Sequence, residues 1–410
     1  MFPRYASDHA KVVLTDTPVL GIVGPRQAGK TTLAKAIGGN RTYFNLDEPG
    51  LRTAALDDPT GLIRDQDRII IDEIQRAPNL MLAVKASVDM DRRPGRFIVT
   101  GSANLLTLRT IKESLAGRIE LLPLMPLSQD ELAGEGPAHF LDRLFAGDRF
   151  LQAKRDPRLT SRVFTGGFPD ALARTSLSRR DDWFAAYASA IAERDIPDIA
   201  SIERPASIPL LLKMVATLNG QLVNANDLGH RLGIDRKTAL RYLDLIEQIY
   251  IIRTLPSWSS NAIKRLVRAP KLHFIDTGLA AHLANLSAEK LTPEKGPFGP
   301  LLESFVLSEL EKQNRWGTGR YDFSHFRDKD GAEVDIVVEN QDGRIAGVEV
   351  KAAATVGRRD FAGLTKLAAA AGDRYAGGVV LYDGEHSLPF GDGKRAVPIS
   401  ALWSPDAISE

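Results

Sequence analysis

The chain has 410 residues, and at roughly 100 to 200 residues per domain this length predicts about two to four domains. Its composition, 43% hydrophobic and 26% charged, is typical of a globular protein, and the formal net charge of +1 excludes a general affinity for polyanions, so any nucleic-acid surface must be local. The chain has no cysteine and no HExxH-like pairing of its 7 histidines, which excludes disulfides, thiol catalysis and cysteine-ligated metals and leaves carboxylates as the candidate metal ligands.

Short apolar runs alternate with helical patterns up to about residue 125, which predicts a parallel α/β sheet within a first domain, 1–150. These runs are VLGIVG, TYFNL, RIIID, RFIVTG and RIELLPL. A helix-rich connecting region, 151–215, and a compact basic segment, 216–290, follow. The proline- and glycine-rich stretch EKLTPEKGPFGP predicts a linker before a second α/β unit, 295–410.

The stretch GPRQAGKTT, residues 24 to 32, fits the phosphate-loop pattern GxxxxGK[ST]. It follows an apolar run and precedes a helical pattern, which is the context this motif requires. Glycines let backbone N–H groups surround phosphates, Lys30 would neutralise the β and γ phosphates, and the Thr31 hydroxyl would bind Mg²⁺. The predicted nucleotide-binding residues are Gly24, Pro25, Arg26, Gln27, Ala28, Gly29, Lys30, Thr31, Thr32, Asp72 and Ser102.

The run RIIIDEIQ predicts the acidic partner of this loop. An apolar strand would deliver Asp72 to the Mg²⁺ shell and Glu73 to a position where it polarises a water molecule. The pair therefore predicts ATP hydrolysis, with Lys30 and Glu73 as catalytic residues. A bare acidic pair at a strand end would otherwise be a solvated turn.

Two further elements are candidates for contact with the γ-phosphate. The strand RFIVTGSAN ends in Thr100, Ser102 and Asn104, any of which could touch the phosphate or its water, or simply cap the strand. Arg118, in SLAGRIELLPL, could be an arginine finger, a γ-phosphate sensor or a surface residue of a strand.

The order of these motifs resembles that of the bacterial and archaeal AAA-type ATPases that carry a DUF4143 carboxyl-terminal region. The similar stretches are GPRQAGKTTL, YFNLDEP, IIIDEIQRAPNL, FIVTGSANLL, LAGRIELLPLMPLS, TGGFPDAL and FIDTGLAAHL, which together span nearly the whole chain. The resemblance implies an ASCE-class P-loop ATPase with ATP and Mg²⁺ as cofactors and a sensor strand at residues 100 to 102. No second sensor arginine is evident after the core, so a ring motor and a nucleotide switch both stay open.

The segment NANDLGHRLGIDRKTALRYLDLIEQIYIIRTLPSW has the apolar spacing of two helices joined by a short turn, the second beginning near Asp235. This spacing predicts a winged helix-turn-helix, which either contacts DNA or only packs against the ATPase. The candidate phosphate contacts are Arg236, Lys237 and Arg241 on the second helix and Lys264, Arg265 and Arg268 in a wing.

The last unit contains Glu303 on a predicted helix, Asp335 in GAEVDIVVE, and Glu349 and Lys351 in GVEVKA. Residues two apart share one face of a strand, so Glu349 and Lys351 should point the same way. The pattern resembles the PD-(D/E)XK nuclease fold, with Val334 in place of the usual proline. That resemblance implies metal ligation by Asp335 and Glu349 and a catalytic Lys351, although such folds also serve for binding alone.

Taken together, these motifs predict an α/β protein: an ATPase that acts on DNA in processing, repair or defence, with an α/β nuclease-like end and a possible ring-like homo-oligomer. The alternative is a nucleotide-dependent switch or toxin-type regulator that acts on a protein partner without cutting nucleic acid. No apolar run of about 18 residues and no signal-peptide-like start are present, so we expect a cytoplasmic protein without membrane contact.

Overall fold

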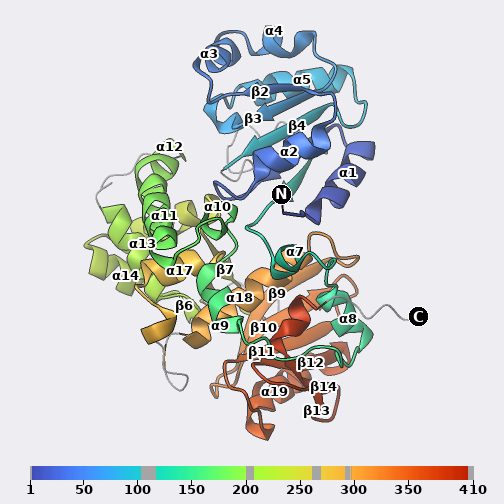
Figure 1. Cartoon of the computed structure of the whole chain (residues 1–410), viewed down its shortest axis with the longest axis vertical. Coiled ribbons are helices and arrows are strands. Elements are labelled where there is room, and N and C mark those ends of the chain that lie inside the picture. Colours follow the sequence, from blue (N-terminus) through green and yellow to red (C-terminus); the bar gives the residue numbers. More distant parts are fainter. Residues whose placement is uncertain are drawn as a thin grey trace.

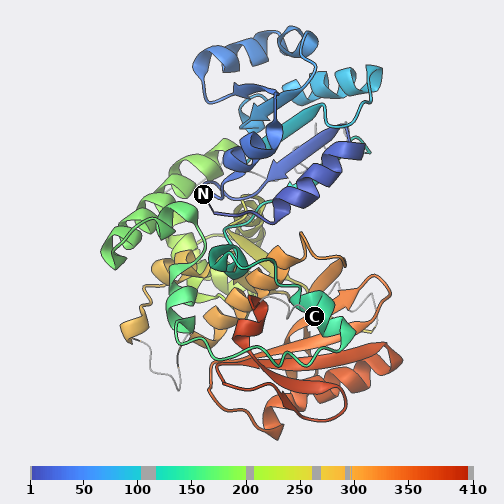
Figure 2. The same cartoon turned by 45° about the vertical axis from the view of Figure 1, so that its right-hand side comes forward.

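The computed structural model describes residues 2–102, 117–199, 207–260, 269–290, 296 and 298–404. An upper α/β unit stands above a larger lower body, which consists of a helical part and a second α/β unit (Figure 1). The same division is visible when the molecule is turned by 45° (Figure 2). No helix in the described part of the chain combines the length and the apolar character needed to cross a bilayer.

The upper unit is built on a five-stranded sheet with the order β2-β3-β4-β1-β5, and every strand pair in it is parallel. Its strands are β1 (Val19–Val23), β2 (Thr42–Asn45), β3 (Ile69–Asp72), β4 (Phe97–Gly101) and β5 (Ile119–Pro123). The central strands are buried along their whole length, as expected where helices cover both faces of a parallel sheet. The predicted parallel α/β sheet is confirmed.

Two hydrophobic clusters cover the two faces of this sheet. The helices of the unit are α1 (Ala6–Asp16), α2 (Lys30–Gly38), α3 (Pro49–Asp57), α4 (Pro59–Arg64) and α5 (Leu80–Met90). Helices α1 and α2 pack with β1, so the phosphate-loop motif lies between a central strand and a covering helix.

A helical region leads from the upper unit into the lower body. It comprises α7 (Gln129–Ala133), α8 (Phe140–Ala146), α9 (Leu159–Thr165), α10 (Pro169–Leu172), α11 (Leu177–Ala190), a π-helix (Ile191–Asp195) and α12 (Ile196–Ile199). Trp183, Phe184 and Tyr187 form the buried face of α11.

The next elements follow the helix and strand order of a winged helix. They are α13 (Ile208–Thr217), β6 (Gln221–Leu222), α14 (Ala225–Leu232), α15 (Arg236–Gln248), β7 (Ile252–Leu255) and β8 (Lys271–Phe274), followed by α17 (Thr277–Leu283). The strands form an antiparallel sheet in the order β6-β8-β7. Asp235 caps α15 by accepting hydrogen bonds from the Lys237 and Thr238 backbone N–H groups, which confirms the predicted start of this helix.

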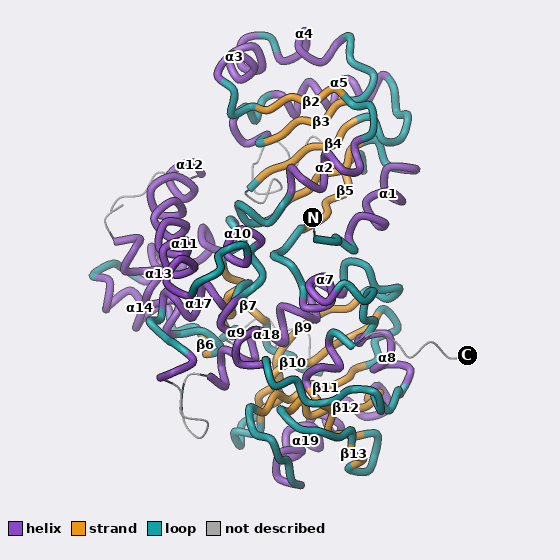
Figure 3. Tube along the Cα trace, in the orientation of Figure 1, coloured by secondary structure: helices purple, strands orange, loops and turns teal. Residues whose placement is uncertain are grey.

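The carboxyl-terminal unit places helices against a six-stranded sheet with the order β13-β14-β12-β11-β10-β9, seen at the bottom of Figure 3. Its elements are α18 (Phe298–Gln313), β9 (Tyr321–Arg327), β10 (Glu333–Asn340), β11 (Ile345–Lys351), α19 (Ala362–Ala371), β12 (Tyr375–Tyr382), β13 (Leu388–Pro389) and β14 (Lys394–Pro398). Strands β9, β10 and β11 are antiparallel, whereas β12 and β14 continue the sheet in parallel. The predicted second α/β unit is therefore present.

Besides a smaller cluster between the carboxyl-terminal sheet and α19, one hydrophobic core runs through the lower body from Phe140 to Trp403. It contains Phe184 of the helical region, Tyr242 of α15 and Phe305 of α18. The segments that the sequence divides at residues 215 and 290 thus share one core, and Phe140 of α8, within the predicted unit 1–150, belongs to that core as well. The lower body is therefore one packed structure.

Candidate active site

The phosphate-loop motif forms a glycine-dependent turn between β1 and α2. Gly24 has φ 147°, and a Cβ atom there would lie 2.1 Å from the Leu124 carbonyl oxygen. Gly29 caps α2 in the left-handed conformation with φ 95°. Because a side chain is blocked at the first position and strained at the second, the turn requires both glycines.

Lys30 is the buried cation of this loop, with 5% of its surface exposed. Its Nζ donates hydrogen bonds to the carbonyl oxygens of Gly24 (3.1 Å) and Pro25 (2.8 Å). Burial lowers the pKa of Lys30 to about 8, although the charges of Glu73 and Asp72 act in the opposite direction. A phosphate group would give this ammonium a charged acceptor that the carbonyl oxygens do not provide.

Asp72, at the end of β3, accepts hydrogen bonds from three hydroxyl groups. Thr31 Oγ1 lies 3.0 and 2.9 Å from its two oxygens, the Tyr43 hydroxyl lies 2.6 Å from Oδ2, and Thr100 Oγ1 contacts Oδ1. The predicted Mg²⁺ ligands, Thr31 and Asp72, are thus side by side. They fit Mg²⁺, which phosphate-loop proteins hold with few protein oxygens together with phosphates and water. Tyr43 was not predicted, because nothing in β2 indicates that its hydroxyl reaches the end of the neighbouring strand.

Glu73 follows Asp72 and has a left-handed backbone with φ 58°, which is uncommon for a non-glycine residue. Its backbone N–H donates to Thr100 Oγ1 at 3.2 Å, and its carboxylate accepts from the Gln75 side-chain amide. The same amide lies 3.0 Å from Ser102 Oγ. Thr100 therefore contacts both members of the acidic pair, and Ser102 is linked to Glu73 only through Gln75. Asn104 lies outside the described residues. Gln75, two residues after Glu73, was not predicted.

The phosphate loop is held from two sides by residues far away in the sequence. Arg4 donates to the Ala28 carbonyl oxygen at 3.2 Å. In the helical region, the Tyr187 hydroxyl donates to the Arg26 carbonyl oxygen at 3.1 Å, and Asp195 pairs with the Arg26 guanidinium at 3.0 Å. These contacts connect the loop to the lower body.

A hollow of about 650 Å³ opens beside the loop. This volume lies within the roughly 300 to 1,000 Å³ of small-molecule sites. Its lining combines the loop with Phe2 and Ser7 near the amino end, Glu73, and Pro169 and Asp170 of α10. A nucleotide there would touch both the upper unit and the helical region.

Arg118 lies away from this hollow. It directly precedes β5, where Ile119 pairs with Val19, and it binds Asp89 with an Nε–Oδ1 distance of 2.6 Å. The phosphate loop follows the opposite end of β1, roughly 15 Å away at about 3.3 Å per strand residue. Within its own chain Arg118 does not face the phosphate loop, so the γ-phosphate sensor hypothesis is corrected, and a finger role requires a second subunit.

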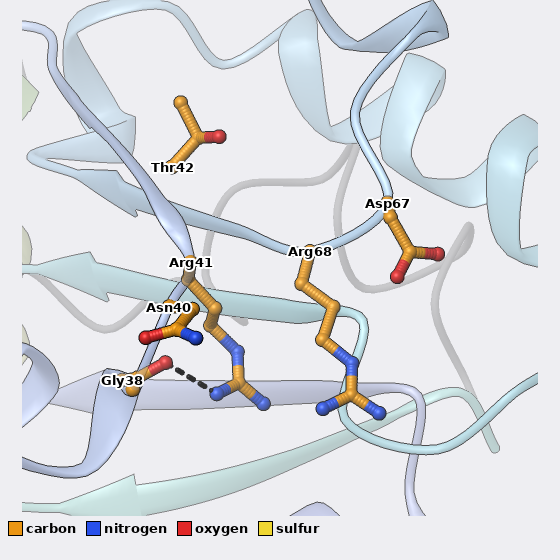
Figure 4. Close-up of a pocket in the computed structure, with 7 residues that line it drawn as sticks. Gly38, Asn40, Arg41, Thr42, Asp67 and Arg68 are labelled. Carbon is orange, nitrogen blue, oxygen red and sulfur yellow. Dashed lines mark hydrogen bonds between the residues drawn. The ribbon is translucent and has the colours of Figure 1, made fainter.

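A second hollow, of about 510 Å³, lies at the amino edge of the same sheet (Figure 4). Arg41 and Arg68 line it and extend in the same direction. Arg41 donates to the carbonyl oxygens of Gly38 (2.6 Å) and Gly95 (2.7 Å), which connects the end of α2 to the turn before β4. Its lining shares no residue with the hollow beside the phosphate loop, so the two hollows are separate.

The basic residues predicted to contact nucleic acid lie on α15 and beyond it. Arg236, Lys237 and Arg241 are all exposed. The other three candidates, Lys264, Arg265 and Arg268, lie outside the described residues.

The carboxylates of the carboxyl-terminal unit gather where α18, β10 and β11 meet. Lys271 Nζ lies 3.2 Å from Glu303 Oε2 and 3.4 Å from Asp335 Oδ1, and Lys351 Nζ lies 2.8 Å from Glu349 Oε1. Burial, together with the charge of Asp335, raises the pKa of both Glu303 and Glu349 to about 8. Lys271 was not predicted, because it is more than 30 residues before the nearest of these carboxylates in the sequence.

Three family models match consecutive parts of the chain. An AAA domain model matches residues 16–133, and two domains of unknown function, DUF8612 and DUF4143, match residues 156–290 and 298–402. Two uncharacterised proteins, from Mycobacterium bovis and Mycobacterium tuberculosis, are each 30% identical over 412 residues, covering 99% of this chain and 86% of theirs. The chain belongs to the family of AAA-type ATPases with a DUF4143 region.

Two solved structures show more distant likenesses to this AAA-type ATPase. One is a signal transduction ATPase with numerous domains from Pyrococcus horikoshii, 14% identical, with a TM-score of 0.26 over 76% of this chain and 46% of that chain. The other is a DNA polymerase III gamma subunit-related protein from Thermotoga maritima, 11% identical, with a TM-score of 0.24 over 60% and 99%. At these scores neither likeness carries an argument about function.

Proposed function

We propose that this AAA-type ATPase hydrolyses ATP with Mg²⁺ and uses the nucleotide cycle to act on nucleic acid in the cytoplasm. The observation that supports hydrolysis best is the contact of Thr31 with Asp72 beside a separately held Glu73. Lys30 and the loop amides would bind the phosphates, Thr31 and Asp72 would hold Mg²⁺, and Glu73 would orient the attacking water.

The nucleic-acid part of the proposal is supported by the exposed cations of α15. Arg236 and Lys237 occupy the first turn of this helix, and Arg241 follows on the exposed side. The second helix of a helix-turn-helix presents its amino-terminal residues to the major groove, where such cations contact phosphates. DNA processing, repair and defence all fit this arrangement, and none of them requires the carboxyl-terminal unit to cut.

The test combines ATP turnover with DNA binding. We expect duplex DNA to stimulate ATP hydrolysis by the full chain, and the triple change Arg236→Ala, Lys237→Ala and Arg241→Ala to weaken binding. Each lost phosphate contact should reduce the slope of log K against log salt by about one unit or less. A matched control is Arg179→Ala, which removes an exposed cation of α11 and should leave the slope unchanged.

A second candidate is a nucleotide-dependent switch that acts on a protein partner. The contacts of Arg26 with Asp195 and Tyr187 favour it, because they link the phosphate loop to the lower body without any nucleic acid. Unchanged DNA affinity and an unchanged salt slope in the triple variant, with ATP turnover indifferent to DNA, would favour this switch.

A further inference from the structure

Lys271 places a buried ammonium group inside the carboxylate cluster of the carboxyl-terminal unit. It lies on β8, in the sheet of the winged-helix segment, and only 4% of its surface is exposed. Its Nζ contacts Glu303, Asp335 and Glu333. A buried charge is costly unless it is paired, and three carboxylates around one ammonium provide that pairing.

Backbone hydrogen bonds around Lys271 determine that its side chain lies among these carboxylates. Strand β8 pairs with β7, and the chain after β7 is bound to β9 of the carboxyl-terminal sheet. There the Trp258 N–H donates to the His325 carbonyl oxygen at 2.6 Å, and the His325 N–H donates to the Pro256 carbonyl oxygen at 2.9 Å. The position of the ammonium therefore follows from the docking of one sheet against the other.

Most of the other polar groups of the cluster also have hydrogen-bond partners within the protein. Asp335 Oδ2 accepts from the Val350 N–H at 2.9 Å, and Lys351 holds Glu349 Oε1. Glu349 Oε2 is buried and accepts no hydrogen bond from the protein. One such oxygen does not make a divalent-cation site, because Mg²⁺ requires near-octahedral oxygen coordination. Over the described ranges, no group of three or more His, Asp or Glu side chains is arranged to hold a metal ion.

We propose that Lys271 occupies the position of the divalent cation in this nuclease-like unit, so that Glu303, Asp335 and Glu349 form a metal-independent ion cluster. An ammonium group neutralises carboxylates but does not act as a Lewis acid toward a phosphodiester or generate a bound hydroxide. The cluster therefore joins the winged-helix sheet to the carboxyl-terminal sheet and does not cut nucleic acid. This inference is independent of the proposed ATP hydrolysis.

The test is calorimetric titration of the nucleotide-free full chain with Mn²⁺ and with Mg²⁺. In the wild type we expect no metal uptake that depends on Glu349, so Glu349→Gln should bind as much metal as the wild type. Lys271→Met should instead bind one additional Mn²⁺, and adding Glu349→Gln to this variant should abolish that binding. Lys351→Met is the matched control, because it removes the other lysine while leaving Lys271 among its carboxylates. Uptake removed by Asp72→Asn belongs to the phosphate loop and is counted separately.

Three results would overturn the inference. The first is wild-type Mn²⁺ or Mg²⁺ uptake that Glu349→Gln abolishes, and the second is metal-dependent DNA cleavage that the same change abolishes. The third is a Lys271→Met protein with a native circular dichroism spectrum and no gain of metal. If Lys271→Met does not fold, the wild-type and Glu349→Gln titrations still decide, because they test the metal site without removing the lysine.

Discussion

The hydroxyl of Tyr43 donates a hydrogen bond of 2.6 Å to Asp72, so a residue of the edge strand β2 holds the carboxylate at the end of the neighbouring strand β3. Burial and this hydrogen bond both raise the pKa of Tyr43, so its hydroxyl stays protonated and acts as a donor at neutral pH. The bond orients the carboxylate that would hold Mg²⁺ with Thr31.

We expect Tyr43→Phe to raise the Mg²⁺ concentration needed for half-maximal ATP turnover by roughly 10- to 100-fold, the usual cost of losing a group that orients a metal ligand. The measurement is a Mg²⁺ titration at saturating ATP. Tyr5→Phe is the control, since the Tyr5 hydroxyl contacts the Asp130 carbonyl oxygen instead of Asp72. Equal Mg²⁺ dependence in Tyr43→Phe and wild type would show that the hydrogen bond has no part in metal binding.

We expect Lys30→Ala and Glu73→Gln to separate binding from hydrolysis. Lys30→Ala removes the phosphate-binding charge, worth about 1.5 to 3 kcal/mol for a hydrogen bond to a charged group, and should weaken ATP binding by roughly 10- to 100-fold. Glu73→Gln keeps the loop and should bind ATP normally while turnover falls by roughly 100-fold or more. Binding by fluorescent ATP and single-turnover hydrolysis measure the two effects. Wild-type turnover in Glu73→Gln would remove this carboxylate from the mechanism.

The lowered pKa of Lys30 predicts proton uptake when ATP binds. With a pKa of about 8 in the free protein, Lys30 is half deprotonated near that pH, and the negative phosphates favour its charged form. Binding should therefore take up about half a proton near pH 8, and almost none near pH 6 from this group. The lowered pKa also affects folding. Between about pH 8 and the higher pKa of the unfolded chain, Lys30 binds more protons in the unfolded chain than in the folded one, so the free energy of unfolding rises with pH in this range.

Calorimetry in buffers of different ionisation enthalpy measures this uptake. Lys35→Met is the control, because Lys35 is an exposed lysine of the same helix and its loss should leave the uptake unchanged. No proton uptake by wild type at pH 8 would show that phosphate does not contact Lys30.

A finger role for Arg118 predicts complementation between subunits. Since Arg118 lies at the end of the sheet opposite the phosphate loop, it could reach a phosphate only in another chain. Mixing Arg118→Ala with Glu73→Gln should then restore part of the ATPase activity, because some interfaces combine an intact arginine with an intact Glu73. A monomeric mass at all concentrations with ATP, or no recovery in the mixture, would leave Arg118 as a structural partner of Asp89.

The sequence predicted the parts of the site whose chemistry is local. Gly24, Lys30 and Thr31 are specified within nine residues, and Asp72 ends an apolar strand, so the motif and its context were sufficient. Tyr43 and Lys271 were missed because each acts across a strand pairing or a sheet contact that no spacing reveals. For Arg118 the sequence left a finger, a sensor and a surface role open. Its place directly before a strand of a parallel sheet puts it at the amino end of the sheet, opposite the phosphate loop, and that argues against the sensor role.

The large core that the segments of the lower body share also determines how far a change at the phosphate loop would extend. Arg26 is paired with Asp195 in a π-helix, and that helix continues α11, whose aromatic face is buried in the same core as the carboxyl-terminal sheet. A displacement of Arg26 toward a bound phosphate would therefore be transmitted to the π-helix and to α11. Because α11 shares its core with the winged helix and the carboxyl-terminal sheet, these parts would move together with it.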